Sequence, residues 1–374
     1  AIWTIAAPSG GADTFRMQFQ GHGTIFMLTT REFRDPSAWY HAILVWDTAQ
    51  SVASERQALY INGQKETAFQ TFTNPTDEQE IGMNLASRTL IGASRNISSG
   101  QDIYRWDGYM TDIHFLDGYA YGPEYFGEFD SNGIWIPKEY TGSYGSNGFF
   151  IDGRDASDLG DDESGNGNDF TTINHGTDDQ VTDSPTNNHC TMNPLRPGSV
   201  TFTEGNTYAT YSASSWTSAM GTIGIPYNSG IYYYEAKVIS HAIYLSFGWG
   251  DVDVGQNQAN NPTTPKFYVY SDYGGKYYSS TDDGSIGDGF TNNDVIGLWY
   301  DSGSTSNNLK FYRNGTLQSS GTKSFDFSDV AHVAPLTQFY SGNSVEYRFD
   351  SAYWTNAPAG ITSANAITTN NIGS

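Results

Sequence analysis

The feature that most constrains the fold of this chain is a pattern of strand, loop and strand that occurs twice. Residues 39–47 read WYHAILVWD and are followed by a polar loop and by LYINGQ at residues 59–64. Residues 294–301 read DVIGLWYD and are followed by a polar loop and by LKFYRNGT at residues 309–316. Asn-Gly after an alternating apolar run predicts a β-hairpin, because both central residues of a type I′ turn need positive φ. The repeat therefore predicts two β-sandwich domains of related design.

The composition is typical of an all-β protein with many turns. The 374 residues include 41 Gly and 26 Tyr, and aromatic residues make up 15% of the chain. Tyr and Thr favour strands, while Gly, Asn and Ser favour turns. The length is sufficient for two domains. We therefore expect an all-β fold with two antiparallel β-sandwich domains and little helix.

The charge of the chain argues against two classes of partner. Its net charge is −23, with 41 acidic and 18 basic residues. Such a surface repels nucleic-acid phosphates and anionic lipids. No apolar run approaches the roughly 18 residues of a membrane helix, so we expect no membrane insertion. Cys190 is the one cysteine, so no intrachain disulfide can form. The absence of disulfides points to a bacterial or viral origin.

Changes in composition along the chain predict four segments. Residues 1–150 and 200–356 contain alternating apolar runs and are each expected to form a sandwich. Residues 151–199 are rich in Asp, Gly and Asn, so they cannot bury a core alone and are expected to form a linker that wraps on a neighbouring domain. Residues 357–374 are small and polar and are expected to form an extended tail.

Several short motifs resemble known families. The first part of the chain contains RDPSAWYH at 34–41, YING at 60–63, WDGY at 106–109, DG at 117–118 and FGE at 126–128. With these motifs, residues 34–130 resemble the second half of a laminin-G or concanavalin-like lectin domain, which has a jelly-roll fold. The second part contains GIYYYE at 230–235, GWG at 248–250 and the second copy of the repeated pattern. With these motifs, residues 200–356 are similar to a SPRY domain.

Four further motifs lie between these two parts: YTGSYGSNGF at 140–149, DDESGNGNDFT at 161–171, DSPTNN at 183–188 and MNPL at 192–195. Together with the motifs above, they resemble a family of marine bacteriophage virion proteins, in which a lectin-like domain precedes a SPRY-like domain. Lectin-like domains of that family begin with strands that have no counterpart before Ala1. The resemblance therefore implies either that this sequence is a fragment or that another chain supplies those strands.

An acidic run offers candidate calcium ligands. Calcium takes six to eight hard oxygen ligands, and concanavalin-like domains often use it. The run does not match the 12-residue EF-hand loop, because no Glu closes it. The alternative is a turn-rich linker held by Asx-turns. The candidate ligands are Asp152, Asp155, Asp158, Asp161 and Asp162.

Tyrosines form the main candidate binding site. Tyrosine offers rigid amphipathic contact area, and sugar rings stack on aromatic faces. The alternative is that alternate tyrosines fill the sandwich core. The candidate glycan-binding residues cluster around Gly274-Gly275 and are Tyr268, Tyr270, Tyr273, Tyr277 and Tyr278.

No catalytic residue is predicted. The seven histidines are scattered without zinc spacing, and no Gly-x-Ser-x-Gly motif is present. Glu235 and Glu346 are the only glutamates expected in apolar strand surroundings, and Glu235 is interpreted as structural. Asp47 and Asp301 end matching strands. An acid site is one interpretation of this pair, but we expect them to accept hydrogen bonds from loop backbone N–H groups.

These observations favour a non-enzymatic virion adhesin, or a fibre or decoration protein, that binds host-surface polysaccharide. Two alternatives remain open: a glycan depolymerase and a purely structural fibre or capsid domain. The expected location is the virion surface, outside the host cell, with other virion proteins as partners. A homo-oligomer is expected, and resemblance to phage fibres favours a trimer.

Overall fold

The computed structural model is almost entirely β, with 39% of residues in strands and 5% in helices. The strands form antiparallel sheets, so the predicted fold class is confirmed. The residues described are 2–6, 16–21, 24–33, 35, 38–80, 91–92, 94–95, 102–103, 108–131, 133–175, 179–181, 183–195, 199–252, 266–278 and 281–372.

The chain divides into two compact units, Ala1–Val181 and Thr182–Ser374. The predicted linker, residues 151–199, is thus shared between the two units. Its acidic part bonds to the first unit, where the backbone N–H of Glu163 donates to Phe150. Its last part enters the core of the second unit through Cys190 and Met192.

The first unit contains a four-stranded sheet of order β1-β2-β3-β7, a three-stranded sheet of order β4-β5-β6 and three two-stranded sheets that pair β8 with β9, β10 with β13 and β11 with β12. The strands are β1 (Ile2–Ala6), β2 (Arg16–Gly21), β3 (Thr24–Thr29), β4 (Ala42–Trp46), β5 (Gln57–Ile61), β6 (Gln64–Lys65), β7 (Phe69–Phe72), β8 (Ser94–Arg95), β9 (Asp102–Ile103), β10 (Ile113–Phe115), β11 (Gly127–Phe129), β12 (Trp135–Pro137) and β13 (Phe149–Ile151). Two short 3-10 helices accompany them, η1 (Ala53–Glu55) and η2 (Pro123–Tyr125).

Two cores hold the first unit together. Phe19 and Phe26 from the four-stranded sheet pack against Trp46 of β4, with ring centres 5.2 and 5.0 Å apart. The two larger sheets therefore face one another across an apolar layer. A second cluster surrounds Phe126, Tyr140 and Tyr144.

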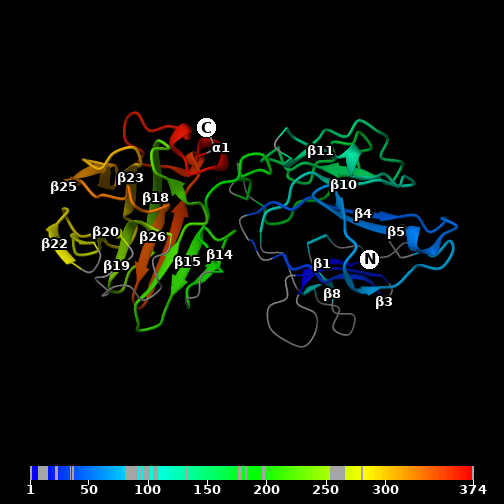
Figure 1. Ribbon diagram of the computed structural model, residues 1–374, viewed down its shortest axis with the longest axis horizontal. Coiled ribbons are helices and arrows are strands. Elements are labelled where there is room, and N and C mark those ends of the chain that lie inside the picture. Colours follow the sequence, from blue (N-terminus) through cyan, green and yellow to red (C-terminus); the bar gives the residue numbers. More distant parts are fainter. Residues whose placement is uncertain are drawn as a thin grey trace. The chain divides into compact units, whose positions relative to one another are not determined.

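The second unit is a sandwich of two sheets, of orders β14-β15-β27-β18-β23-β24-β25 and β16-β26-β19-β20-β21-β22, with β17 also paired to β26 (Figure 1). Its strands are β14 (Thr201–Thr203), β15 (Tyr208–Tyr211), β16 (Thr217–Met220), β17 (Ile225–Pro226), β18 (Ile231–Ser240), β19 (Leu245–Asp251), β20 (Phe267–Ser271), β21 (Gly275–Tyr278), β22 (Thr281–Ser285), β23 (Val295–Asp301), β24 (Leu309–Arg313), β25 (Thr316–Lys323), β26 (His332–Phe339) and β27 (Asn343–Arg348). Its short helices are η4 (Ser351–Tyr353), η5 (Ser363–Asn365) and α1 (Thr369–Ile372).

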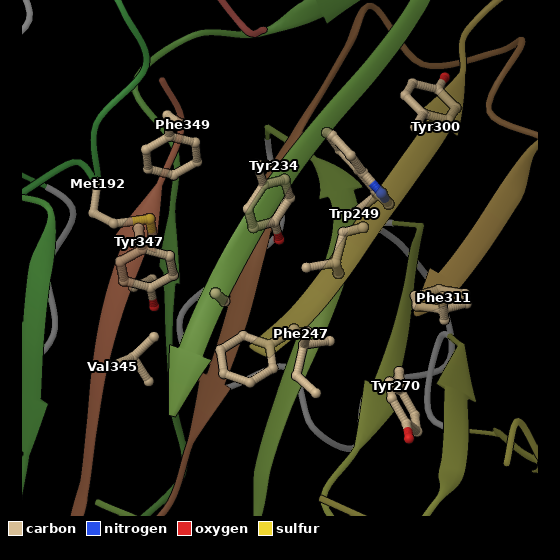
Figure 2. Close-up of a cluster of buried hydrophobic side chains, with 14 of the residues drawn as sticks. Met192, Tyr234, Phe247, Trp249, Tyr270, Tyr300, Phe311, Val345, Tyr347 and Phe349 are labelled. Atoms are coloured by element: carbon tan, nitrogen blue, oxygen red, sulfur yellow. The ribbon is translucent and has the colours of Figure 1, made fainter. Parts of the chain in front are cut away.

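Successive side chains of β18 point to opposite faces of its sheet, and both faces are buried. Tyr234 lies in the main core, where its ring meets the edge of Trp249 from β19 at 5.1 Å (Figure 2). Tyr233 points to the other face and packs against Trp299 and Trp354. Both faces of β18 are therefore covered, which accounts for the nearly continuous burial of this strand.

The end of the chain completes this core. Residues 357–372, predicted as an extended tail, fold back onto the second sandwich. Ile367 is fully buried in the main core, and its backbone oxygen accepts a hydrogen bond from the N–H of Cys190 at 2.8 Å. A bridge between His189 and Thr368 continues this contact. The segments that precede and follow the strands of the second unit in the chain thus pair with each other.

The repeated pattern forms the same three-stranded meander in both units, β4-β5-β6 and β23-β24-β25. Asn62 and Asn314 have φ of +49° and +50°, and each is followed by a glycine of positive φ. These are the values that a type I′ turn requires, so both predicted hairpins are confirmed.

Candidate functional site

A group of loops meets at one end of the second sandwich. The register pairs Thr217 and Leu245 with the same residue, Phe339, and pairs Tyr211 with Asn343. The loops 212–216, 241–244 and 340–342 therefore all lie at the same end of the sandwich. We call this place the loop end.

Three aromatic rings come together at the loop end. The ring centres of Trp216 and Tyr244 lie 5.5 Å apart in a stacked arrangement, and Tyr340 lies 5.5 Å from Trp216 and 5.6 Å from Tyr244. Tyr244 is 41% exposed, while Trp216 and Tyr340 are half-buried. This aromatic triad supplies apolar ring surface beside hydroxyl and indole groups, a combination suited to ligand contact.

The backbone of Tyr244 is held in an unusual conformation. Its φ is +48°, a region that costs a bulky L-residue roughly 1–2 kcal/mol. The backbone N–H of Tyr244 donates to Asp272 at 3.1 Å, and its backbone oxygen accepts from the N–H of Tyr340 at 3.0 Å. Strain that surrounding contacts maintain is frequent at binding sites.

Asn343 fixes the two loops that carry Tyr244 and Tyr340. Its side chain is fully buried and accepts from the N–H of Ala242 at 3.1 Å. The same amide donates to the backbone oxygens of Ile243, at 2.9 Å, and of Tyr340, at 3.3 Å. The triad is therefore ordered before any ligand arrives.

His241 and Asp272 form a second brace at the loop end. The Nε2 of His241 lies 2.8 Å from Oδ2 of Asp272, and the backbone N–H of His241 donates to Asn292 at 2.6 Å. A catalytic histidine needs a nucleophile or a reacting group within hydrogen-bond distance. The hydrogen bonds described for His241 go to Asp272 and Asn292, and they hold the loop in place.

The structure corrects part of the predicted tyrosine site. Tyr268 and Tyr270 are 2% and 0% exposed, because alternating positions of β20 fill the core (Figure 2 shows Tyr270). Neither ring can stack on a sugar. Tyr273 is 49% exposed on the turn after β20. The side chains of Tyr277 and Tyr278 lie outside the described residues.

The described residues do not bring the predicted calcium ligands together in one group. Asp155, Asp158 and Asp162 accept hydrogen bonds from backbone N–H groups two residues further on, those of Ser157, Gly160 and Ser164. Asp152 bonds the backbone of Arg154 in the same way, so Asx-turns order this run. In the part of the chain that the structure describes, which includes Asp161, no group of three or more acidic, His or Cys side chains could hold a metal.

The acidic residues considered for catalysis have structural partners. Glu235 is fully buried and accepts from the N–H groups of Thr355 and Asn356 at 2.9 and 2.8 Å. It therefore anchors the segment after β27. Asp301 accepts from the N–H of Gly303 at 3.0 Å, as expected, while Asp47 accepts from the side-chain amide of Gln50.

One pair of carboxylates in the first unit shares an arginine. Arg154 contacts Asp112 at 3.7 Å and Asp152 at 3.3 Å. Burial raises the pKa of Asp112, and the nearby Arg154 opposes that change. The arrangement is an ion-pair network in which the largely exposed Arg154 contacts both acids.

Sequence reasoning missed the triad. Trp216 and Tyr340 each stand at a strand end beside small residues, in SSW at 214–216 and YSG at 340–342. Aromatic residues next to Ser or Gly at strand ends were the available signal. Their convergence depends on the register of β16, β19 and β26, which the sequence does not show.

Comparisons with known proteins identify one domain. Residues 231–351 match the family model described as SPRY domain, so the predicted SPRY domain is confirmed over that range. Two solved structures resemble the chain: the SPRY domain of human HERC1 (18% identity, 42% of this chain and 96% of that chain, TM-score 0.34) and a human SPRY domain (15% identity, 40% of this chain and 95% of that chain, TM-score 0.31). No curated protein matches. The described helices are all too short to cross a lipid bilayer.

Proposed function

We propose that this protein is a non-enzymatic adhesin of a bacteriophage virion that binds host-surface polysaccharide through the loop end of its second sandwich. The observation that carries the proposal is the ordered, partly exposed triad of Trp216, Tyr244 and Tyr340. Flat aromatic faces suit the C–H faces of sugar rings, and the tyrosine hydroxyls suit their edges. The resemblance to phage virion proteins supports the location on the virion surface and the lectin-like nature of the first unit.

The state of the acidic side chains favours binding over turnover. Glycoside hydrolysis needs two carboxyl groups about 5 to 10 Å apart that face a substrate. Glu235 is fully buried under the segment it anchors, and Arg154 holds Asp112 and Asp152. SPRY domains are also generally not catalytic.

The charge of the loop end favours an uncharged sugar. His241 is the one basic residue in the loops 212–216, 241–244, 272–274 and 340–342, and it already faces Asp272. A sulfated or uronic ligand would find no further basic side chain in these loops to bind it. We therefore expect neutral polysaccharides to bind best.

A second candidate is a protein ligand, because SPRY domains are protein-interaction domains. Ile243 and Tyr273, 40% and 49% exposed, extend the apolar surface of the loop end. Another virion protein would be the natural partner in that case. The structural alternative, a fibre or capsid domain, needs a repeated apolar face around a symmetry axis.

Weak single sites gain strength by repetition. Linked copies raise avidity by roughly 10²- to 10⁴-fold without new contacts. We therefore include a homo-oligomer, with a trimer favoured, in the proposal. Binding to host cells is expected to fall sharply when the protein is made monomeric.

The decisive experiment is a glycan array probed with the wild-type chain and with Trp216→Ala. The matched control is Tyr227→Ala, because Tyr227 is 45% exposed and lies away from the loop end. Tyr227 follows β17, and β17 pairs with His332 and Val333 at the end of β26 that is opposite to the loop end. We expect Trp216→Ala to reduce glycan binding at least tenfold and Tyr227→Ala to leave it unchanged. Equal binding by both variants, or steady release of reducing ends from the polysaccharide, would refute the proposal.

A further inference from the structure

A stack of three tyrosines stands on the surface of the first unit. Tyr119, Tyr121 and Tyr125 lie within seven residues of the loop that joins β10 to β11. Tyr121 stacks on Tyr119 at 5.6 Å and 13°, and on Tyr125 at 4.3 Å and 23°. Tyr119 is 42% exposed and Tyr125 is 44% exposed. We call this group the tyrosine stack.

The tyrosine stack rests on a rigid base. Tyr121 packs against the cluster of Phe126, Tyr140 and Tyr144, and its ring centre is 6.2 Å from that of Tyr140. Pro123 is the first residue of the short helix η2. The backbone N–H of the buried Phe126 donates to the backbone oxygen of Pro123 at 2.9 Å. The rings are thus held in position, so a ligand would order few side chains on binding.

Each ring of the stack carries a hydroxyl group that can donate and accept hydrogen bonds. Burial first, and then the phenols of Tyr121, Tyr119 and Tyr125, raise the pKa of Tyr140. The hydroxyl of Tyr140 itself donates to the backbone oxygen of Ser143 at 2.8 Å. The surface therefore combines aromatic rings with hydroxyl donors and acceptors.

The size of the stack fits a sugar better than a protein. An aromatic side chain buries roughly 150 to 250 Å² when it is fully covered. With less than half of each outer ring exposed, the stack offers on the order of 200 to 300 Å² of contact, against about 800 Å² per partner in a stable protein interface. One or two sugar rings cover such an area.

The charges around the stack select among sugars. Asp117 and Glu124 are the charged residues of the loop itself. Lys138 lies beside it, and its ammonium group donates to the backbone oxygen of Glu124 at 3.3 Å. An anionic ligand is disfavoured, because two carboxylates lie near the stack and the ammonium group of Lys138 is already hydrogen-bonded.

We propose that the tyrosine stack of Tyr119, Tyr121 and Tyr125 is a second binding site for uncharged polysaccharide, which makes each chain bivalent. The inference rests on the proposed glycan binding, but it uses different residues in a different unit. Two sites on one chain convert the second contact into an intramolecular event. Long polysaccharides should therefore bind more tightly than short oligosaccharides of the same sugar.

The test is affinity electrophoresis of the full chain in gels containing neutral galactan, mannan or β-glucan, with sulfated galactan and a polyuronate as anionic counterparts. The Trp216→Ala chain should keep part of its retardation in a neutral gel, and adding Tyr119→Ala and Tyr125→Ala should remove at least nine tenths of what is left. Tyr125→Trp should retain it, because the ring remains. The matched control is Phe72→Ala, which removes a ring that is 39% exposed in the same unit.

Each result separates the two proposals. If Trp216→Ala alone removes all retardation, the second site is refuted and the loop end stands. If only the tyrosine substitutions act, the loop end is refuted and the second site stands. Stronger retardation in the anionic gels would refute the uncharged ligand, and no retardation of the wild-type chain in any neutral gel would refute both sites.

Discussion

The side-chain amide of Asn343 donates to the backbone oxygen of Ile243 at 2.9 Å, although the two residues are 100 positions apart in the chain. Through this contact and its bonds to Ala242 and Tyr340, one buried side chain sets the positions of two triad loops. The binding surface proposed here therefore depends on a residue that no ligand touches.

Replacing Asn343 with alanine should weaken glycan binding and stability together. The change leaves buried backbone groups without partners, at a cost of about 1–3 kcal/mol in the free energy of unfolding. Chemical denaturation and a glycan-binding titration would measure the two effects. Ser319→Ala is the control, because Ser319 is exposed on β25 of the same unit. Unchanged affinity in folded Asn343→Ala would contradict a positioning role.

Replacing Ile367 with alanine should destabilise the second unit by roughly 2–5 kcal/mol, since the side chain is fully buried in the main core. Urea denaturation of the full chain would give the value. Leu317→Ala, at a position 42% exposed, should change stability by less than about 0.5 kcal/mol. Similar effects of the two substitutions would show that the final segment does not complete the core.

Asn314 should tolerate glycine better than alanine. Its side chain accepts from the N–H of Val295 at 2.8 Å and donates to Asp294 at 2.7 Å, and its φ is +50°. Both substitutions lose these bonds, but only alanine also carries the strain of positive φ, worth about 1 kcal/mol. Thermal denaturation of the two variants tests the order. The equivalent pair at Asn62, whose side chain accepts from the N–H of His41, should show the same order.

The first unit should lose stability as pH falls below neutrality. Burial, with a smaller contribution from His41, lowers the pKa of His114 to about 4, against 6.5 for an unperturbed histidine. The unfolded chain therefore binds a proton that the folded chain excludes, so this stabilisation is complete above about pH 6.5 and is lost as pH falls toward 4. Burial lowers the pKa of His41 as well, in the same direction.

Hydrogen exchange of β10 and β13 between pH 7.5 and 4.5, corrected for intrinsic exchange rates, would follow this change. His114→Phe keeps the stacking on Phe150, whose ring centre lies 4.2 Å away, and removes the titration. The variant should show a shallower pH dependence. An identical slope in both proteins would assign the acid sensitivity to other groups.

Local sequence signals predicted the hairpins well and the site poorly. The Asn-Gly turns follow from backbone preferences of single residues, and both turns occur where they were expected. Burial was harder to predict from the same alternation. The pattern of β23 and that of β4 look alike, yet β23 lies between β18 and β24, whereas β4 pairs with β5 alone among the described strands.

The tyrosines of β20 show why two predicted glycan-binding residues proved to be buried. Alternation says that Tyr268 and Tyr270 share a face of their strand, but it does not say whether that face meets solvent or the opposite sheet. Packing against Phe311 and Phe290 places them inside. Trp216, Tyr244 and Tyr340 looked like isolated aromatic residues, because the strands that unite them are far apart in the chain.

The sequence by itself determined the all-β character, the two meanders, the SPRY domain and the acidic surface, because these depend on local preference, short motifs and composition. Only the tertiary structure decided which aromatic rings reach the surface and that Ile367 lies in the core beside Cys190. It also decided that the aspartates after β13 accept hydrogen bonds from backbone N–H groups two residues further along the chain. These outcomes depend on sheet register and on contacts between distant segments. A register shift of one residue would exchange the buried and exposed faces of a strand without changing any local signal.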